Sequence, residues 1–154
     1  MRLKLFKILL GVVLILIALE IPASDEDGEL YCLAKNIYFE AGNQPLVGRI
    51  AVAQVTINRK NHSLFPNSIC DVVYQGGEVR NKCQFSWYCD GRGDTPTDSD
   101  TWLKNFILAN DILNGISLDI TEEALWYHAD YIDKPYWAHE LTETVKINNH
   151  IFYK

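Results

Sequence analysis

The chain has 154 residues, of which 48% are hydrophobic, 22% charged and 12% aromatic. These proportions are typical of one ordinary globular domain and exclude a disordered or fibrous chain. The formal net charge of −6 argues against a nucleic-acid binder, which needs clustered Lys and Arg to replace the counterions on phosphates.

The N-terminus has the pattern of an export signal. Three basic residues among the first seven precede an apolar run over residues 8–19, and three acidic residues follow at 25–27. A basic start, a short apolar run and a small residue at the cleavage point are typical of a signal peptide, whereas a spanning helix needs about 20 apolar residues. We predict that residues 1–24 are a signal peptide cleaved after Ala23, or an uncleaved membrane anchor. Residues 25–154 then form one exported domain, periplasmic or extracellular.

Four cysteines follow this leader: Cys32, Cys70, Cys83 and Cys89. An even count in a small exported domain predicts two disulfides, although four cysteines allow three pairings. The last two are separated by five residues, which is not the close spacing of a metal finger. We favour a local Cys83–Cys89 bond, which leaves Cys32 with Cys70. Free buried thiols are the alternative.

Two helices are predicted next. Apolar residues recur at helical spacing over 29–41, and Gly42 follows as a stop. A second apolar face predicts a helix over 45–59, with Pro45 in its first turn. Since only three residues join them, the two helices form a hairpin.

Turn-forming residues dominate the stretch 75–100, which predicts a long surface loop containing an aromatic cluster at 85–88. Long loops of this kind are often functional. A third helix follows, with Ser99 or Asp100 as its cap and Asn114-Gly115 as its end. Its apolar stripe consists of Trp102, Phe106, Ala109 and Leu113.

The C-terminal part changes to short β-prone segments at 124–128, 144–147 and 150–153, with a tight turn at Asn148-Asn149. The predicted fold class is therefore α+β, mostly helical with a small antiparallel sheet.

Glu40 is the most informative acid. It lies seven residues after Leu33, at the edge of the apolar stripe of the first predicted helix. A carboxyl group at the border of a core loses solvation, which raises its pKa towards that of a general acid. A solvated glutamate at a helix end is the alternative from spacing alone.

Several segments, in this order, resemble the SleB/CwlJ-type cell-wall hydrolases, the spore-cortex-lytic enzyme family. They are CLAKNIYFEA (32–41), GRIAVAQVTINR (48–59), FPNSICDVVYQ (65–75), CQFSW (83–87), ALWYHA (124–129) and the terminal HIFY (150–153). The resemblance covers nearly all of the chain after the leader.

The resemblance implies a lysozyme-like α+β catalytic domain in which Glu40 is the catalytic acid and base of a lytic transglycosylase. Such an enzyme cuts peptidoglycan between N-acetylmuramic acid and N-acetylglucosamine and leaves a 1,6-anhydro sugar, so one glutamate suffices and no cofactor is needed. The family motif usually continues Glu-Ala-Arg-Gly-Glu. Here it reads Glu40-Ala41-Gly42-Asn43-Gln44, which leaves Glu40 in place but puts in doubt any contact made by the missing Arg and Glu.

Further residues are candidates for substrate binding. Gln84 and Ser86 are expected to hydrogen-bond sugar groups, and Trp87 or Tyr88 is expected to stack on a sugar ring, with loop packing as the alternative for these residues. Tyr127 and His128 match the aromatic-aromatic-His motif of the family, which implies a position near the cleft.

Two other functions are weighed against the enzyme. One is a zinc-dependent amidase using the evenly spaced His128, His139 and His150, which lack the usual helical zinc motif. The other is an exported, non-catalytic peptidoglycan-binding module. The main prediction is a monomer whose partner is the glycan strand, with membrane association through the N-terminal segment as an added expectation.

Overall fold

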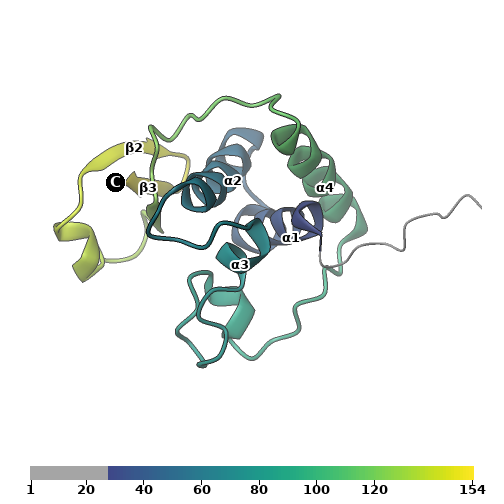
Figure 1. Ribbon diagram of the computed structural model, residues 1–154, viewed down its shortest axis with the longest axis horizontal. Helices are drawn as coiled ribbons and strands as arrows, with labels where there is room; N and C mark the ends of the chain where they lie inside the picture. The colour runs from purple at the N-terminus through teal and green to yellow at the C-terminus, as the bar shows by residue number, and fades with distance from the viewer. Residues whose placement is uncertain (1–27) are drawn as a thin grey trace, which may run out of the picture.

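The computed structural model describes residues 28–154, so the predicted leader and its cleavage site lie outside the described residues. Helices form one side of the molecule, and the three strands and their connections form the other (Figure 1). Within residues 28–154, no helix has the length and apolar character needed to cross a bilayer.

The first two helices lie where the sequence predicts them. Helix α1 spans Glu29–Ala41, and helix α2 spans Leu46–Asn61. Pro45 precedes α2 as its cap in an extended conformation, so its predicted place inside the first turn is wrong. Helix α2 also runs two residues beyond the predicted end, which matters because its last turn contains Arg59.

The next two helices correct the sequence analysis. Helix α3, Ile69–Val73, was not predicted; the Ser68 side chain caps it by accepting a hydrogen bond from the backbone N–H of Asp71 at 3.1 Å. Helix α4 spans Ser99–Leu113. Its cap is Asp98, not Ser99 or Asp100, because the Asp98 carboxylate accepts from the N–H of Thr101 at 2.7 Å.

Three antiparallel strands form the sheet in the order β1-β3-β2. Strands β1 (Trp126–Ala129), β2 (Glu143–Ile147) and β3 (His150–Tyr153) agree with the predicted β segments. Asn148 takes a positive φ of 50° in the two-residue turn that joins β2 to β3, which confirms the tight turn. Short helices η1 (Ser86–Cys89) and η2 (Tyr136–His139) lie in the long connections.

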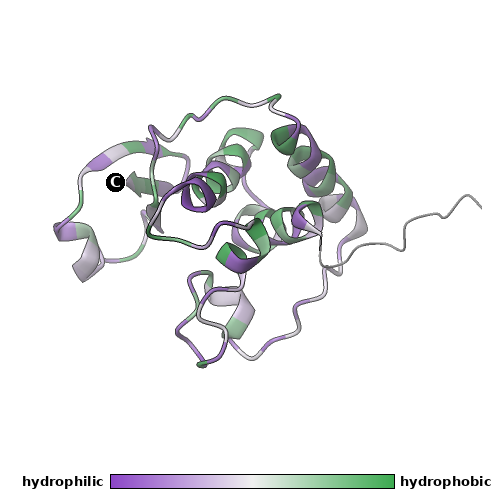
Figure 2. Cartoon of the chain, viewed as in Figure 1, coloured by the Kyte–Doolittle hydropathy of each residue, from purple (hydrophilic) through white to green (hydrophobic). Residues whose placement is uncertain are grey.

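The core lies between the helices. Buried apolar side chains of α1 pack against α3 and α4, so hydrophobic colour is concentrated on the inner helix faces (Figure 2). A second, smaller cluster joins α2 to the sheet through Ala51, Val55 and Phe152. Helix α2 therefore contacts both parts of the molecule, and its C-terminal end lies next to β1.

Both predicted disulfides are present. Cys32 in α1 is bonded to Cys70 in α3, and Cys83 is bonded to Cys89 at the end of η1. The first bond joins two helices across 38 residues of chain, whereas the second closes a loop of six.

Candidate active site

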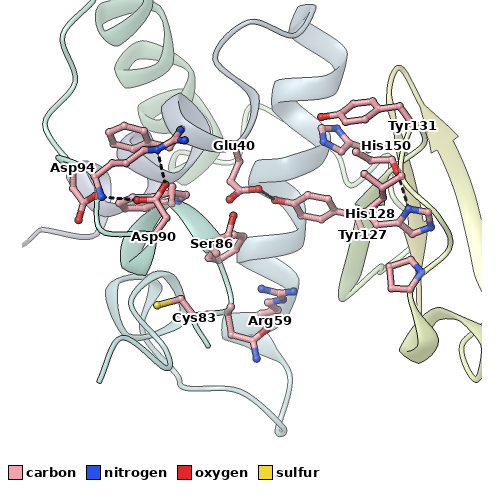
Figure 3. Close-up of a pocket in the computed structure, with 18 of the residues that line it drawn as sticks. Glu40, Arg59, Cys83, Ser86, Asp90, Asp94, Tyr127, His128, Tyr131 and His150 are labelled. Carbon is pink, nitrogen blue, oxygen red and sulfur yellow. Dashed lines mark hydrogen bonds and ion pairs between the residues drawn. The ribbon is translucent and has the colours of Figure 1, made fainter. Parts of the chain in front are cut away.

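Glu40 lies in the last turn of α1, at the wall of an open cleft of about 710 Å³. One wall of the cleft is the loop 83–94, which contains η1. The other wall consists of β1, the connection that follows it and the start of β3. In Figure 3, Glu40 lies between these walls, with Asp90 and Asp94 on one side and His128, Tyr131 and His150 on the other.

The hydroxyl of Tyr127 donates a hydrogen bond to Oε2 of Glu40 at 2.7 Å (Figure 3). Burial raises the pKa of Glu40 above its ordinary value of 4.5, although this hydrogen bond and the positive charge of Arg59 oppose the shift. Burial also raises the pKa of Tyr127 well above 10.0, and the Glu40 charge adds to that shift. Tyr127 therefore keeps its proton and remains a hydrogen-bond donor to the carboxyl group.

Two of the predicted substrate-binding residues lie on the loop wall. Gln84 and Ser86 are exposed side chains that line the cleft. Their position follows from the Cys83–Cys89 bond and η1, which hold the loop in a compact turn.

Trp87 lines the cleft but is only 7% exposed and belongs to the main core. Its ring stacks on Phe39 at 4.7 Å between centroids, and its indole N–H donates to Oδ1 of Asn36 at 2.9 Å. A ring packed in this way has little surface left for a sugar. The structure therefore favours the alternative that Trp87 packs the loop against α1.

On the opposite wall, His128 is buried and hydrogen-bonded through both ring nitrogens. Nδ1 lies 2.8 Å from the carbonyl oxygen of Ala129, and Nε2 lies 3.0 Å from the Tyr153 hydroxyl. Because a carbonyl oxygen only accepts, Nδ1 carries a proton and donates to Ala129, and Nε2 pairs with the Tyr153 hydroxyl. This arrangement fixes the orientation of the imidazole at the cleft.

The three evenly spaced histidines do not converge on one site. Among the described residues 28–154, no three His, Cys, Asp or Glu side chains are grouped so that they could hold a metal ion. His139 is exposed on η2, whereas His128 and His150 line the cleft. The geometry thus gives no support to the zinc-amidase alternative.

Sequence reasoning missed several cleft residues. Arg59 is buried in the cleft wall, and its charge acts on both Glu40 and Tyr127. Asp90 and Asp94 lie on the loop wall, where turn residues signalled only a loop. Arg59 follows Asn58 near the end of α2 and lies on the same buried face of the helix as Val52 and Val55. An arginine on the apolar side of an amphipathic helix needs a partner, and that position is the signal that could have identified Arg59.

The model of the Cell Wall Hydrolase family matches residues 43–153, which begin just after Glu40. The spore cortex-lytic enzyme of Bacillus subtilis strain 168 is 30% identical over 137 residues, which is 88% of this chain and 41% of that protein. A match of that extent in a chain of 154 residues must include Glu40. A spore cortex-lytic enzyme of Bacillus cereus is 28% identical over 87% of this chain and 47% of its own length.

Two solved structures have the same fold. The catalytic domain of the Bacillus cereus SleB protein superposes with a TM-score of 0.63 at 28% identity, covering 82% of this chain and 89% of that one. The catalytic domain of the germination-specific lytic transglycosylase SleB from Bacillus anthracis gives a TM-score of 0.65 at 28% identity, covering 87% of this chain and all of that one. The predicted lysozyme-like α+β fold and the predicted SleB/CwlJ-type resemblance are confirmed.

The chain spans about two fifths of the length of the Bacillus subtilis enzyme and nearly all of the solved catalytic domains. Its similarity is therefore to the catalytic part of those proteins. The family match over most of the chain, together with these relatives, shows that the chain belongs to the Cell Wall Hydrolase family.

Proposed function

We propose that this chain cuts the glycan strands of peptidoglycan between N-acetylmuramic acid and N-acetylglucosamine, as a lytic transglycosylase with Glu40 as its single acid and base. The observation that carries the proposal is the Glu40 carboxyl group, placed in the cleft wall with a raised pKa and a hydrogen bond from Tyr127. The similarity to a spore cortex-lytic enzyme and to the catalytic domain of a lytic transglycosylase supports it.

The reaction moves two protons, one from Glu40 to the leaving oxygen and one from the substrate back to Glu40. Protonated Glu40 gives its proton to the glycosidic oxygen, and the bond from that oxygen to C1 of the muramoyl sugar breaks with its electron pair on the oxygen. The Glu40 carboxylate then takes the proton of the muramoyl C6 hydroxyl as that oxygen bonds to C1. No water is consumed, the product ends in 1,6-anhydro-muramic acid, and Glu40 is protonated again.

Tyr127 decides which carboxyl oxygen performs this transfer. Its hydroxyl occupies Oε2, whereas Oε1 of Glu40 has no hydrogen-bond partner within residues 28–154. Oε1 is therefore the oxygen that faces substrate. We place the glycan strand between the walls, with Gln84 and Ser86 as hydrogen-bonding groups on one side and the ring of His128 as part of the surface on the other. In this proposal residues 25–154 are an exported, monomeric catalytic domain behind the leader 1–24.

The test is Glu40→Gln, with Glu78→Gln as a matched control on an exposed loop outside the cleft. The amide preserves volume and still accepts from Tyr127, but it has no acidic proton to give. We expect Glu40→Gln to bind purified sacculi but to lose at least about 10²–10⁴-fold in turnover, because the Glu40 carboxyl group would serve as the acid in one step and the base in the other. Glu78→Gln should cut as the wild type does.

Mass spectrometry of the released sugars identifies the reaction. Products ending in 1,6-anhydro-muramic acid are expected from the wild type. Reducing-end muramic acid would instead make the enzyme a hydrolase, with Asp90 or Asp94 in the loop wall as the candidate that activates water. Full activity in Glu40→Gln would overturn the assignment of Glu40 as acid and base. If the wild type bound sacculi without cutting them, the chain would instead be a peptidoglycan-binding module.

A further inference from the structure

Arg59 is a buried cation held rigidly in the cleft wall. Its side chain is 4% exposed, and its Nε donates to the carbonyl oxygen of Leu125 at 2.7 Å. The guanidinium carbon lies 4.9 Å from the ring centroid of Phe85 and 5.3 Å from that of Phe65. These three contacts come from the loop, from the segment before α3 and from the residue before β1, so the charge has little freedom to move.

This cation has no acidic partner in direct contact. Within residues 28–154, no carboxylate lies within 4 Å of its guanidinium, and Nη1 is buried without a hydrogen-bond partner. The ionisable groups that act on it are Glu40 and Tyr127. An arginine buried at this cost needs a compensating role, because an unpaired charge in a protein interior is unfavourable.

We propose that Arg59 is a positioning residue that stabilises the negative charge developing on Glu40 as its proton passes to the glycosidic oxygen. The inference rests on the proposed function of Glu40. A fixed charge in a cleft wall of low dielectric acts strongly and needs no reorganisation during the reaction. Because Arg59 does not form a direct ion pair with Glu40, it stabilises the carboxylate without occupying the oxygens that must exchange the proton.

Other ionisable groups at the cleft are less suited to this role. Besides Arg59 and Tyr127, they are Asp90, Arg92, Asp94, His128, Tyr131 and His150. Arg92 is exposed and lies 3.9 Å from the carboxylate of Asp90, so its charge is solvated and partly compensated. Burial lowers the pKa of His150, which favours its neutral form. Arg59 is therefore the buried cation among the described residues that line the cleft.

The experiment compares two neutral variants, Arg59→Met and Arg59→Gln, with Arg59→Lys, which keeps the charge. Lys60→Gln is the matched control, since it removes a positive charge from the next position of α2 outside the cleft. One measurement is the pH dependence of kcat/KM on glycan strands. The other is the pKa of Glu40 itself, titrated by NMR with a 13C-labelled carboxyl group.

The sign of the effect follows from the charge. Arg59 favours the charged form of Glu40 and so opposes the rise in its pKa. In the neutral variants the Glu40 pKa should rise. The alkaline limb of the pH profile of kcat/KM, where Glu40 loses its proton, should therefore move to higher pH. Their kcat should fall at least about tenfold, because charge developing on Glu40 is no longer stabilised. Arg59→Lys and Lys60→Gln should leave the limb in place.

An unchanged alkaline limb and an unchanged Glu40 titration in folded Arg59→Met or Arg59→Gln would overturn the proposal. Wild-type protein supplies a test that needs no variant to fold. A buried charge is screened little by salt, so the Glu40 pKa should stay constant as ionic strength rises. A salt-dependent pKa would assign the effect to exposed charges and reject Arg59. The titration needs no turnover, so it separates this inference from failure of the proposed function.

Discussion

Glu40 is a costly residue for the fold. Burial outweighs the Tyr127 hydrogen bond and the Arg59 charge, so the pKa of Glu40 lies above its unfolded value of 4.5. Between these two values the folded chain holds a proton that the unfolded chain has released. Stability therefore falls as pH rises through this interval, and the full penalty is present above the raised pKa.

Glu40→Gln should consequently be more stable than the wild type at neutral pH, by about 0.5–2 kcal/mol, as is common when a strained functional group is replaced. The difference should shrink as pH falls through the raised pKa and disappear below the unfolded value. Thermal unfolding of both proteins across this pH range measures it. A variant that is less stable at neutral pH would mean that the Glu40 carboxylate stabilises the fold.

The sequence predicts Glu40 but not its partner. A family motif and the apolar stripe identify the acid, because both are local in the chain. Tyr127 lies 87 residues away, and its hydroxyl reaches Glu40 only because β1 passes the end of α1. Motif order placed Tyr127 near the cleft, yet no spacing rule gives a hydrogen bond between a helix and a distant strand.

At the scale of the elements, a chain of buried polar groups fastens η1 to the helices. The Trp87 indole donates to Oδ1 of Asn36 in α1, and Nδ2 of Asn36 donates to the Thr56 hydroxyl in α2 at 3.1 Å. Thr56 in turn donates to the carbonyl oxygen of Val52. Buried polar groups of this kind are expensive to leave unpaired, so the chain fixes how the three elements meet.

Trp87→Ala should therefore lower the free energy of unfolding by about 3–5 kcal/mol, as expected for a large aromatic ring removed from a core. This differs from the expectation from sequence, which gave Trp87 to the substrate. Denaturant unfolding measures the loss, and Ser86→Ala, on the exposed face of the same short helix, is the control that should unfold like the wild type. An unchanged free energy of unfolding with a lower rate per folded molecule would instead support the predicted role of Trp87 in binding substrate.

Elements with many periodic residues were predictable, and those fixed by one contact were not. Helix α1 has clear helical periodicity and Gly42 after its end, and the strands were predictable from β-prone residues and the turn at Asn148-Asn149. Helix α3 has only five residues, too few for a periodic signal. The start of α4 depends on one carboxylate, and neighbouring Asp98, Ser99 and Asp100 are all good caps, so sequence alone could not choose among them.

At the scale of the whole molecule, the two disulfides should differ in effect. Unreduced, unfolded protein from an oxidising compartment should contain no free thiol by titration. Replacing Cys32 and Cys70 by Ala should destabilise the fold by about 2–4 kcal/mol, because their bond closes the longer loop. Replacing Cys83 and Cys89 by Ala should cost less in unfolding free energy and should mainly raise KM, since that bond holds Gln84 and Ser86 at the cleft.

Four free thiols in that titration would contradict the first expectation. Equal losses of stability in the two double variants, with KM unchanged, would contradict the second. The predictions of a single domain and of the α+β class follow from composition and spacing, and the favoured disulfide pairing follows from spacing among the three that four cysteines allow. The cleft does not, because its walls come from residues 83–94 and 127–150, and their meeting depends on how α1 and α2 pack between them.

The small ring closed by Cys83 and Cys89 also makes completion of the cleft depend on disulfide formation. While Cys83 and Cys89 remain reduced, the wall with Gln84 and Ser86 lacks its tether. Oxidation then completes the cleft. For a chain that we propose to cut the wall of bacteria, this order is a safeguard: the cutting surface would be finished only after the protein has left the cell interior that made it.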